Sequence, residues 1–265
     1  MTPPNPTLAE LLEQLFVQPG VAPGATAAVA KRGPQGWQLH LAAVGSLGPA
    51  SPSSPMASVP VQTDTLYDLA SVTKPVVALL CARLAAIGML PLSTPLGTWV
   101  AEARNTPSEH LSLETLLSHR AGLLAHLDLF EPLRRREQLV PSFAVHAAAS
   151  ARRSECSGEL PEQGFPPLYS DLGYLLVGEA VQRATQRNLD ELIDEHVNRP
   201  CNTTLFSARQ WRAKDPAFQA RTAPTEWVTW RGGFVHGIVH DENAWALARE
   251  GCAGNAGLFA DAANV

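Results

Sequence analysis

The apolar residues of this 265-residue chain change their spacing twice along the sequence, and that change constrains the fold more than any other feature. Residues 25–31 and 37–44 are strand-like runs, and Gly-Pro-Gln-Gly at 33–36 reads as a turn between them, which predicts a hairpin. From about residue 71 to 220 the spacing is mainly that of helices. Short apolar runs punctuated by glycine return near residue 232. This order predicts an α/β domain interrupted by a helical insertion.

Local signals mark where several helices begin and end. Thr7 and Glu10 form a capping box that opens a short helix through Phe16. A second capping pattern at 188–191 opens a helix that we expect to end before Pro200. Further helices are predicted by apolar spacing at 75–87, 111–117 and 172–181, and the Ser- and Pro-rich stretch 46–60 is predicted to be a loop.

Ser71 and Lys74 stand at the start of a predicted helix that continues through an apolar run and stops at Gly88. Pro75 is compatible with this, because backbone N–H groups in a first turn lack intrahelical partners. Residues three apart lie on one helix face, so a hydroxyl and an amine should be side by side. Two interpretations remain open: a capping serine with a solvated lysine, or a serine nucleophile activated by the lysine. The apolar helix favours the second, because it would bury one end of the pair.

Tyr169 directly precedes the apolar helix predicted at 172–181. A tyrosine that lies against a lysine can share its proton and serve as general base or acid. The alternative is a core tyrosine whose hydroxyl is satisfied by hydrogen bonds.

Four segments occur in an order that resembles the serine β-lactamase-related hydrolases: LYDLASVTKPV, LLSHRAGL, YSDLGYLLVGE and VHDENA…GCAGNAGLF. That family includes class C β-lactamases, D-alanyl-D-alanine carboxypeptidases and family VIII-type esterases. The resemblance covers about residues 24–260. It implies an α/β (α+β), beta-lactamase/transpeptidase-like fold, with an antiparallel sheet flanked by helices and an inserted all-helical domain. We expect residues 1–74 and 221–265 to form the sheet domain and residues 75–220 the helical domain.

The resemblance also implies roles for individual residues. Ser71 would be the acylated nucleophile, Lys74 its proton partner, and Tyr169 the general base that later protonates the leaving group. The backbone N–H groups of Ser71 and Leu258 would form the oxyanion hole. The residues expected to contact substrate are Asp171, Asn255, Ala256 and Gly257.

Two positions depart from the family pattern. Asp171 stands where asparagine is usual; it keeps an acceptor for Lys74 but lacks the amide donor. An ionised Asp171 would hold the lysine charged, which makes Tyr169 the more suitable base. Asn255 stands where the family usually has lysine or histidine, so a cation facing a substrate carboxylate is missing. We therefore expect neutral acyl esters to be better substrates than penicillins or D-Ala-D-Ala peptides.

The family pattern continues beyond Val265 with two further strands and a packing helix, so we expect a truncated piece of a longer protein or a decayed copy. The rival function is therefore a decayed or non-catalytic member that binds an acyl or peptidoglycan-like ligand. The set of Ser71, Lys74 and Tyr169 favours an enzyme: a serine hydrolase acting by an acyl-enzyme on a small-molecule ester, amide or β-lactam.

Other functions lack their sequence signals. The net charge is −5 and the longest basic run is the triple arginine at 134–136, so nucleic acid is not an expected partner. No P-loop, dinucleotide fingerprint or G-x-S-x-G elbow occurs, and no cofactor is expected. His236 and His240 have the spacing of a helical metal pair, but the glycines around them argue against a helix, and no metal is expected. His119, near Gly122, is expected to be structural or a charge at a helix end.

Properties of the whole sequence suggest where the protein acts. No stretch is long and apolar enough to span a membrane, and the N-terminus lacks the pattern of a secretory signal. The four cysteines are scattered and are expected to be reduced thiols. We therefore expect a cytoplasmic protein.

Overall fold

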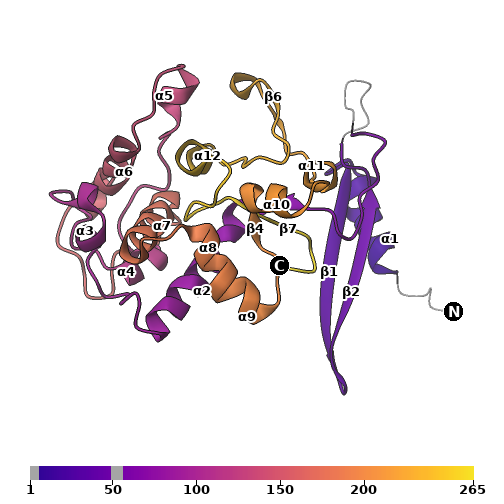
Figure 1. The fold of residues 1–265 in the computed structure, drawn as a ribbon, viewed down its shortest axis with the longest axis horizontal. Coiled ribbons are helices and arrows are strands. Elements are labelled where there is room, and N and C mark those ends of the chain that lie inside the picture. Colours follow the sequence, from indigo (N-terminus) through magenta and orange to yellow (C-terminus); the bar gives the residue numbers. More distant parts are fainter. Residues whose placement is uncertain (1–5, 49–55) are drawn as a thin grey trace.

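The computed structural model describes residues 6–48 and 56–265. A long hairpin stands at one side of the molecule with α1 (Leu8–Leu12) against it, and most of the other helices pack together on the other side (Figure 1). Part of the loop predicted at 46–60 lies outside the described residues. At its described ends, Ser46 pairs with Pro60 in an isolated bridge.

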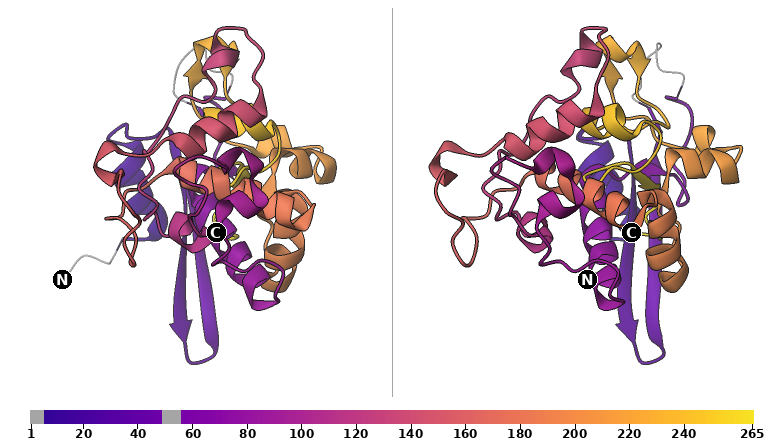
Figure 2. Two further views of the ribbon diagram at one scale, coloured as in Figure 1. Left: turned by 90° about the vertical axis from the view of Figure 1, so that its left-hand side faces the viewer. Right: turned by 60° about the vertical axis from the view of Figure 1, so that its left-hand side comes forward.

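The hairpin predicted from the sequence is confirmed. It consists of β1 (Gly24–Gly33) and β2 (Gly36–Gly45), which pair in antiparallel register with Gly33 opposite Gly36. It extends well beyond the body of the molecule (Figure 2). The capping box is also confirmed, because Thr7 and Glu10 bond reciprocally at the start of α1 (Leu8–Leu12), which continues as a π-helical turn, Glu13–Val17.

A second sheet lies at the centre of the molecule. Its middle strand is β7 (Leu258–Ala260), which pairs antiparallel with β3 (Tyr67–Asp68) on one edge and with β4 (Phe206–Ser207) on the other. A third, two-stranded sheet joins β5 (Trp227–Val228) to β6 (Gly233–Phe234). The described strands thus form three separate antiparallel sheets. The pairing of β4 with β7 ties the segment predicted as helical to the sheet, and the division into two domains stays a prediction.

Eleven α-helices lie in the segment between β3 and β7, all of it within the described residues. They are α2 (Thr73–Ala86), α3 (Leu96–Trp99), α4 (Leu113–Leu117), α5 (Glu131–Arg134), α6 (Pro141–Ser150), α7 (Asp171–Thr185), α8 (Leu189–Ile193), α9 (Arg199–Cys201), α10 (Ala208–Lys214), α11 (Phe218–Arg221) and α12 (Glu242–Ala248). Across the described ranges, none of them is long and apolar enough to cross a bilayer.

One predicted helix end was wrong. The helix opened by Asn188 does not stop before Pro200, because α8 continues through a π-helical turn, Asp194–Asn198, into α9. Pro200 therefore lies in the first turn of α9.

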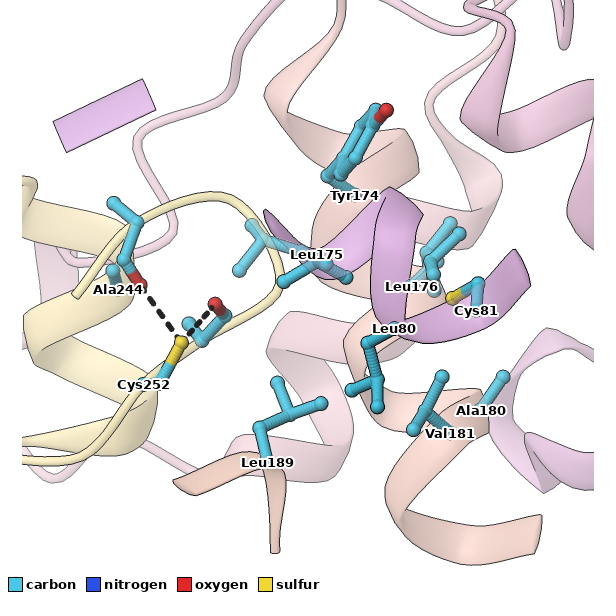
Figure 3. Close-up of a cluster of buried hydrophobic side chains, with 14 of the residues drawn as sticks. Leu80, Cys81, Tyr174, Leu175, Leu176, Ala180, Val181, Leu189, Ala244 and Cys252 are labelled. Atoms are coloured by element: carbon cyan, nitrogen blue, oxygen red, sulfur yellow. Dashed lines mark hydrogen bonds between the residues drawn. The ribbon is translucent and has the colours of Figure 1, made fainter. Parts of the chain in front are cut away.

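The core that fixes the site is formed where α2 packs against α7 (Figure 3). Leu80 and Cys81 of α2 and Leu176 of α7 are buried in it. Burial raises the pKa of Cys81 to about 12, so this thiol is inert at neutral pH. All four cysteines are free; Cys201 is exposed and the other three are buried. Because α2 carries Lys74 and α7 begins with Asp171, this packing sets the distance between their charges.

Candidate active site

Ser71 and Lys74 are side by side, as their spacing predicts. Ser71 lies in a 3-10 turn, Ala70–Val72, that leads directly into α2. The Nζ atom of Lys74 donates a hydrogen bond to Ser71 Oγ at 2.8 Å. Neither the turn nor α2 has a side-chain cap, so the interpretation of Ser71 as a helix cap is wrong. Ser71 is exposed whereas Lys74 is only 3% exposed, which presents the hydroxyl to a ligand and keeps the amine behind it.

The Lys74 ammonium is surrounded by three oxygens. Besides Ser71 Oγ, it donates to the backbone carbonyl of Asn255 at 3.2 Å. Asp171 Oδ1 lies 2.7 Å from Nζ as an ion pair that lacks the alignment of a hydrogen bond. An ammonium has three donors and no acceptor. An ammonium held by these three oxygens has no lone pair with which to receive the serine proton.

Tyr169 is brought to the same place by the start of α7. Ser170 caps this helix through a bond from the Gly173 N–H group to its Oγ, and Asp171 is the first helical residue. The Tyr169 ring centre lies 4.8 Å from Lys74 Nζ, and the residue is 51% exposed. The alternative of a buried core tyrosine is therefore wrong for Tyr169. The sequence prediction that Ser71, Lys74 and Tyr169 lie together is confirmed, and their catalytic roles stay a prediction.

The His119 ring packs against the Tyr169 ring. Its ring centre lies 4.9 Å from that of Tyr169 and 5.2 Å from that of Tyr174. Its Nδ1 atom accepts a hydrogen bond from the Ser170 N–H group at 3.1 Å, so a neutral ring carries its proton on Nε2. Burial, and then the charge of Lys74, lower the pKa of His119. These contacts fit the predicted structural role and not that of a helix-end charge.

Acidification is expected to weaken the fold through His119. Its pKa in the folded chain lies below the ordinary 6.5, so the unfolded chain takes up this proton first as the pH falls. The contribution of neutral His119 to the free energy of unfolding is complete above about pH 6.5. It is lost as the pH falls through the lower pKa of the folded state. Thermal unfolding should be measured for wild type and His119→Asn between about pH 7.5 and 5. The difference between their Tm values should become smaller as the pH falls. Asparagine is chosen because it tolerates the left-handed backbone of this position (φ 59°). A Tm difference that stays constant with pH would contradict the prediction.

The segment 255–258 does not line the site as predicted. Asn255, Ala256 and Leu258 are at most 1% exposed, and the Leu258 N–H group donates to Thr73 Oγ1 at 3.3 Å. That N–H group is therefore not available to an oxyanion, and the predicted role of Leu258 is wrong. Asn255 approaches the site only through its backbone carbonyl, since its side chain is buried without a hydrogen-bond partner among the described residues. A cation at position 255 would be buried beside Lys74 instead of facing a substrate.

Gly257 is required for packing and not for substrate approach. Its φ of 122° is unfavourable for a residue with a side chain. A Cβ atom there would meet the Gly251 carbonyl oxygen at 2.9 Å and the Cys252 Cα atom at 3.0 Å. The close neighbour that we expected to be substrate is the chain's own backbone, because residues 251–260, which end in the central strand β7, are buried.

Sequence reasoning missed one imidazole beside the site. His126 places Nδ1 3.4 Å from Asp171 Oδ2 and Nε2 3.4 Å from Asp128 Oδ1. Asp171 therefore faces Lys74 with one oxygen and an imidazole with the other. No sequence signal identifies His126, because its neighbour in the site, Asp171, comes from a helix start 45 residues away.

The two histidines with metal-like spacing have separate partners. His236 Nε2 contacts the Thr222 carbonyl at 2.7 Å, and His240 Nε2 contacts Glu226 Oε1 at 2.7 Å. Both lie outside any helix, as the nearby glycines predict. Asp241, the residue directly before α12, caps that helix by accepting a hydrogen bond from the Ala244 N–H group. In the part of the chain that the structure describes, no three His, Cys, Asp or Glu side chains are grouped as metal ligands.

Comparison with curated proteins finds relatives with several names. A putative D-alanyl-D-alanine carboxypeptidase of Escherichia coli strain K12 is 26% identical over 233 residues, which cover 78% of this chain and 50% of the relative. An N-acetylmuramyl-L-alanine amidase of Bacillus subtilis strain 168 is 24% identical, covering 76% and 48%. Esterase EstB of Burkholderia gladioli is 32% identical over 170 residues, covering 54% and 38%. The chain spans about half the length of the first two relatives.

Solved structures agree on the fold. A class C beta lactamase from Rhodobacter sphaeroides matches 97% of this chain and 62% of its own, with a TM-score of 0.66 and 16% identity. An octameric penicillin-binding protein homologue from Pyrococcus abyssi matches 97% and 55%, with a TM-score of 0.68 and 18% identity. The predicted beta-lactamase/transpeptidase-like fold, with helices and antiparallel sheets, is thereby confirmed. A protein-family model described as Beta-lactamase matches residues 12–265, nearly the whole chain. The chain therefore belongs to the beta-lactamase family.

Proposed function

We propose that this chain carries the nucleophilic half of a serine hydrolase site that works through an acyl-enzyme on Ser71. The observation that carries the proposal is the 2.8 Å hydrogen bond from the buried Lys74 ammonium to an exposed serine hydroxyl. A capping serine would bond to backbone N–H groups of its helix, and Ser71 does not. The named carboxypeptidase, amidase and esterase relatives are consistent with acyl transfer from esters or amides.

Tyr169 is the group that we assign to proton transfer. Lys74 cannot take the serine proton while three oxygens surround its ammonium. The Tyr169 ring centre lies 4.8 Å from Lys74 Nζ, and a tyrosine that lies against a lysine can serve as general base or acid. In the proposed step the Ser71 oxygen bonds to the acyl carbon as Tyr169 takes its proton. The bond to the leaving group then breaks, and Tyr169 returns the proton to that group.

The charges around Ser71 favour a neutral acyl substrate. Lys74 is already paired with Asp171, whose other oxygen faces His126 and, beyond it, Asp128. A substrate carboxylate would therefore have to compete with Asp171 for Lys74. We propose a short neutral ester as the better substrate and the Ser71 N–H group as an oxyanion donor.

The second candidate is a decayed or non-catalytic member of the family that binds an acyl or peptidoglycan-like ligand. The observation that favours it is the hydrogen bond from the Leu258 N–H group to Thr73, which removes one of the two predicted oxyanion donors. A single donor would stabilise a tetrahedral intermediate poorly.

Covalent labelling distinguishes the two candidates. A fluorophosphonate forms a bond from Ser71 Oγ to phosphorus with loss of fluoride and the serine proton, which requires an activated nucleophile. We expect the folded chain to gain the mass of one phosphonyl group, and peptide mapping to locate it at Ser71. Heat-denatured chain is the control and should remain unlabelled. A folded chain that gains no mass would favour the non-catalytic candidate.

A further inference from the structure

The residue directly before the nucleophile has an unfavourable backbone conformation. Ala70 has a φ of 44°, in the left-handed region that residues with a Cβ atom seldom occupy. Ala70 begins the 3-10 turn that contains Ser71, so its conformation sets the direction in which the chain enters this turn. Such a conformation persists only where surrounding contacts impose it. The contacts around Ala70 therefore control how the serine is presented.

Asp68 supplies the contact that holds Ala70. Its Oδ1 atom accepts a hydrogen bond from the Ala70 N–H group at 2.8 Å, and its Oδ2 atom accepts one from the His240 N–H group at 2.7 Å. Each carboxylate oxygen thus serves one backbone donor. Burial raises the pKa of Asp68, whereas both N–H donors lower it, so the two bonds hold the charged group where it is partly removed from water.

Both ends of this bridge are tied to other parts of the molecule by hydrogen bonds. Asp68 belongs to β3, which pairs with the central strand β7. Leu69, the next residue, donates its N–H group to the Leu258 carbonyl at 2.9 Å and accepts a bond from the Val72 N–H group at 2.8 Å. His240 lies in the connection from β6 to α12 near the top of Figure 1, and Arg231 binds its carbonyl at 3.1 Å.

We propose that Asp68 is a positioning residue for the nucleophile, which holds Ala70 in its left-handed conformation and so directs the Ser71 hydroxyl to Lys74. The proposal rests on the proposed function of Ser71. It assigns Asp68 no contact with substrate, so its loss should lower the rate of acylation with little change in KM. A small displacement of a nucleophile is costly, because acylation depends on the angle and distance of attack.

A glycine at position 70 distinguishes two possible roles of Asp68: positioning of Ser71 through Ala70, and general support of the fold. Glycine adopts positive φ without the steric cost that alanine carries, so it does not need Asp68 to hold it there. If Asp68 acts through Ala70, the change Ala70→Gly should restore acylation to a chain that lacks Asp68. If Asp68 only ties β3 to the His240 connection, glycine at position 70 should restore nothing.

The test compares fluorophosphonate labelling rates and ester kcat and KM for wild type, Asp68→Ala, Ala70→Gly and the double variant. We expect Asp68→Ala to label about tenfold or more slowly with a similar KM, Ala70→Gly to stay near wild type, and the double variant to recover most of the loss. Asp68→Asn keeps one acceptor oxygen and the side-chain shape, so its labelling rate should lie between those of wild type and Asp68→Ala. This variant replaces Asp68→Ala in the test if the alanine variant does not fold.

The outcomes are distinct for the two proposals. Absence of labelling in wild type overturns the serine hydrolase proposal itself. Labelling of wild type and of folded Asp68 variants at equal rates overturns the positioning role alone. A slow Asp68 variant that Ala70→Gly does not improve, while Ala70→Gly by itself labels normally, also overturns it.

Discussion

The Ser71→Ala variant is expected to lose hydrolysis of a short p-nitrophenyl ester by about 1000-fold or more in kcat/KM. Without the Oγ atom no acyl-enzyme can form, and only binding and residual electrostatic stabilisation remain. The fold should be unaffected, because Ser71 is exposed and its described side-chain bond is the one from Lys74. We expect the free energy of unfolding to change by about 1 kcal/mol or less, as measured by urea denaturation.

Ser154→Ala is the matched control for this measurement. Ser154 is an exposed serine in a 3-10 turn, Ser154–Cys156, and its hydroxyl contacts Glu155. The control should keep wild-type ester hydrolysis. Equal activity in Ser71→Ala and wild type would mean that another group carries the reaction and that the assignment of the nucleophile is wrong.

The Asp171→Ala variant is expected to lose about 3 kcal/mol or more of the free energy of unfolding. The reason is that Lys74, whose side chain is 4% exposed, would keep its charge in the interior without the carboxylate 2.7 Å away. Removing one partner of a buried pair leaves the other charge uncompensated, which costs more than the pair contributes. Asp171→Asn keeps an oxygen acceptor near the ammonium, so its loss should be smaller.

A double variant shows whether the loss comes from the unpaired charge. Lys74→Met replaces the ammonium by an apolar side chain of similar length, and Lys74→Met/Asp171→Ala removes both charges. We expect urea denaturation to show that the double variant is more stable than Asp171→Ala alone, although it should be inactive. If the two single losses simply add in the double variant, the ion pair is not the cause.

The hairpin and the Ser71–Lys74 pair could be predicted because both depend on residues close in sequence. A turn sequence between two strand-like runs fixes the register that places Gly33 opposite Gly36. A spacing of three residues places the serine and lysine together once a helix is recognised. Tyr169 needed the order of several motifs, because only the packing of α7 against α2 brings it to Lys74.

The segment 255–258 and Asp68 could not be assigned because their partners are distant in sequence. Leu258 bonds to Thr73 across 185 residues, and Asp68 bonds to His240 across 172. A short glycine-containing motif does not reveal whether its N–H groups face a ligand or the protein interior. For Gly257 the interior is the neighbour, so a pattern that fits a substrate-binding strand marks a packing contact.

The contrast between one exposed and three buried thiols makes the chain convenient for site-specific spectroscopy. Maleimides react with thiolates, and burial raises the pKa of both Cys81 and Cys252 far from the range in which thiolates form. A maleimide dye should therefore attach to the native chain at Cys201 alone, at the end of α9. Its fluorescence anisotropy would follow the helical side of the molecule without any engineered residue, and appearance of further labelled thiols would report the opening of the core between α2 and α7.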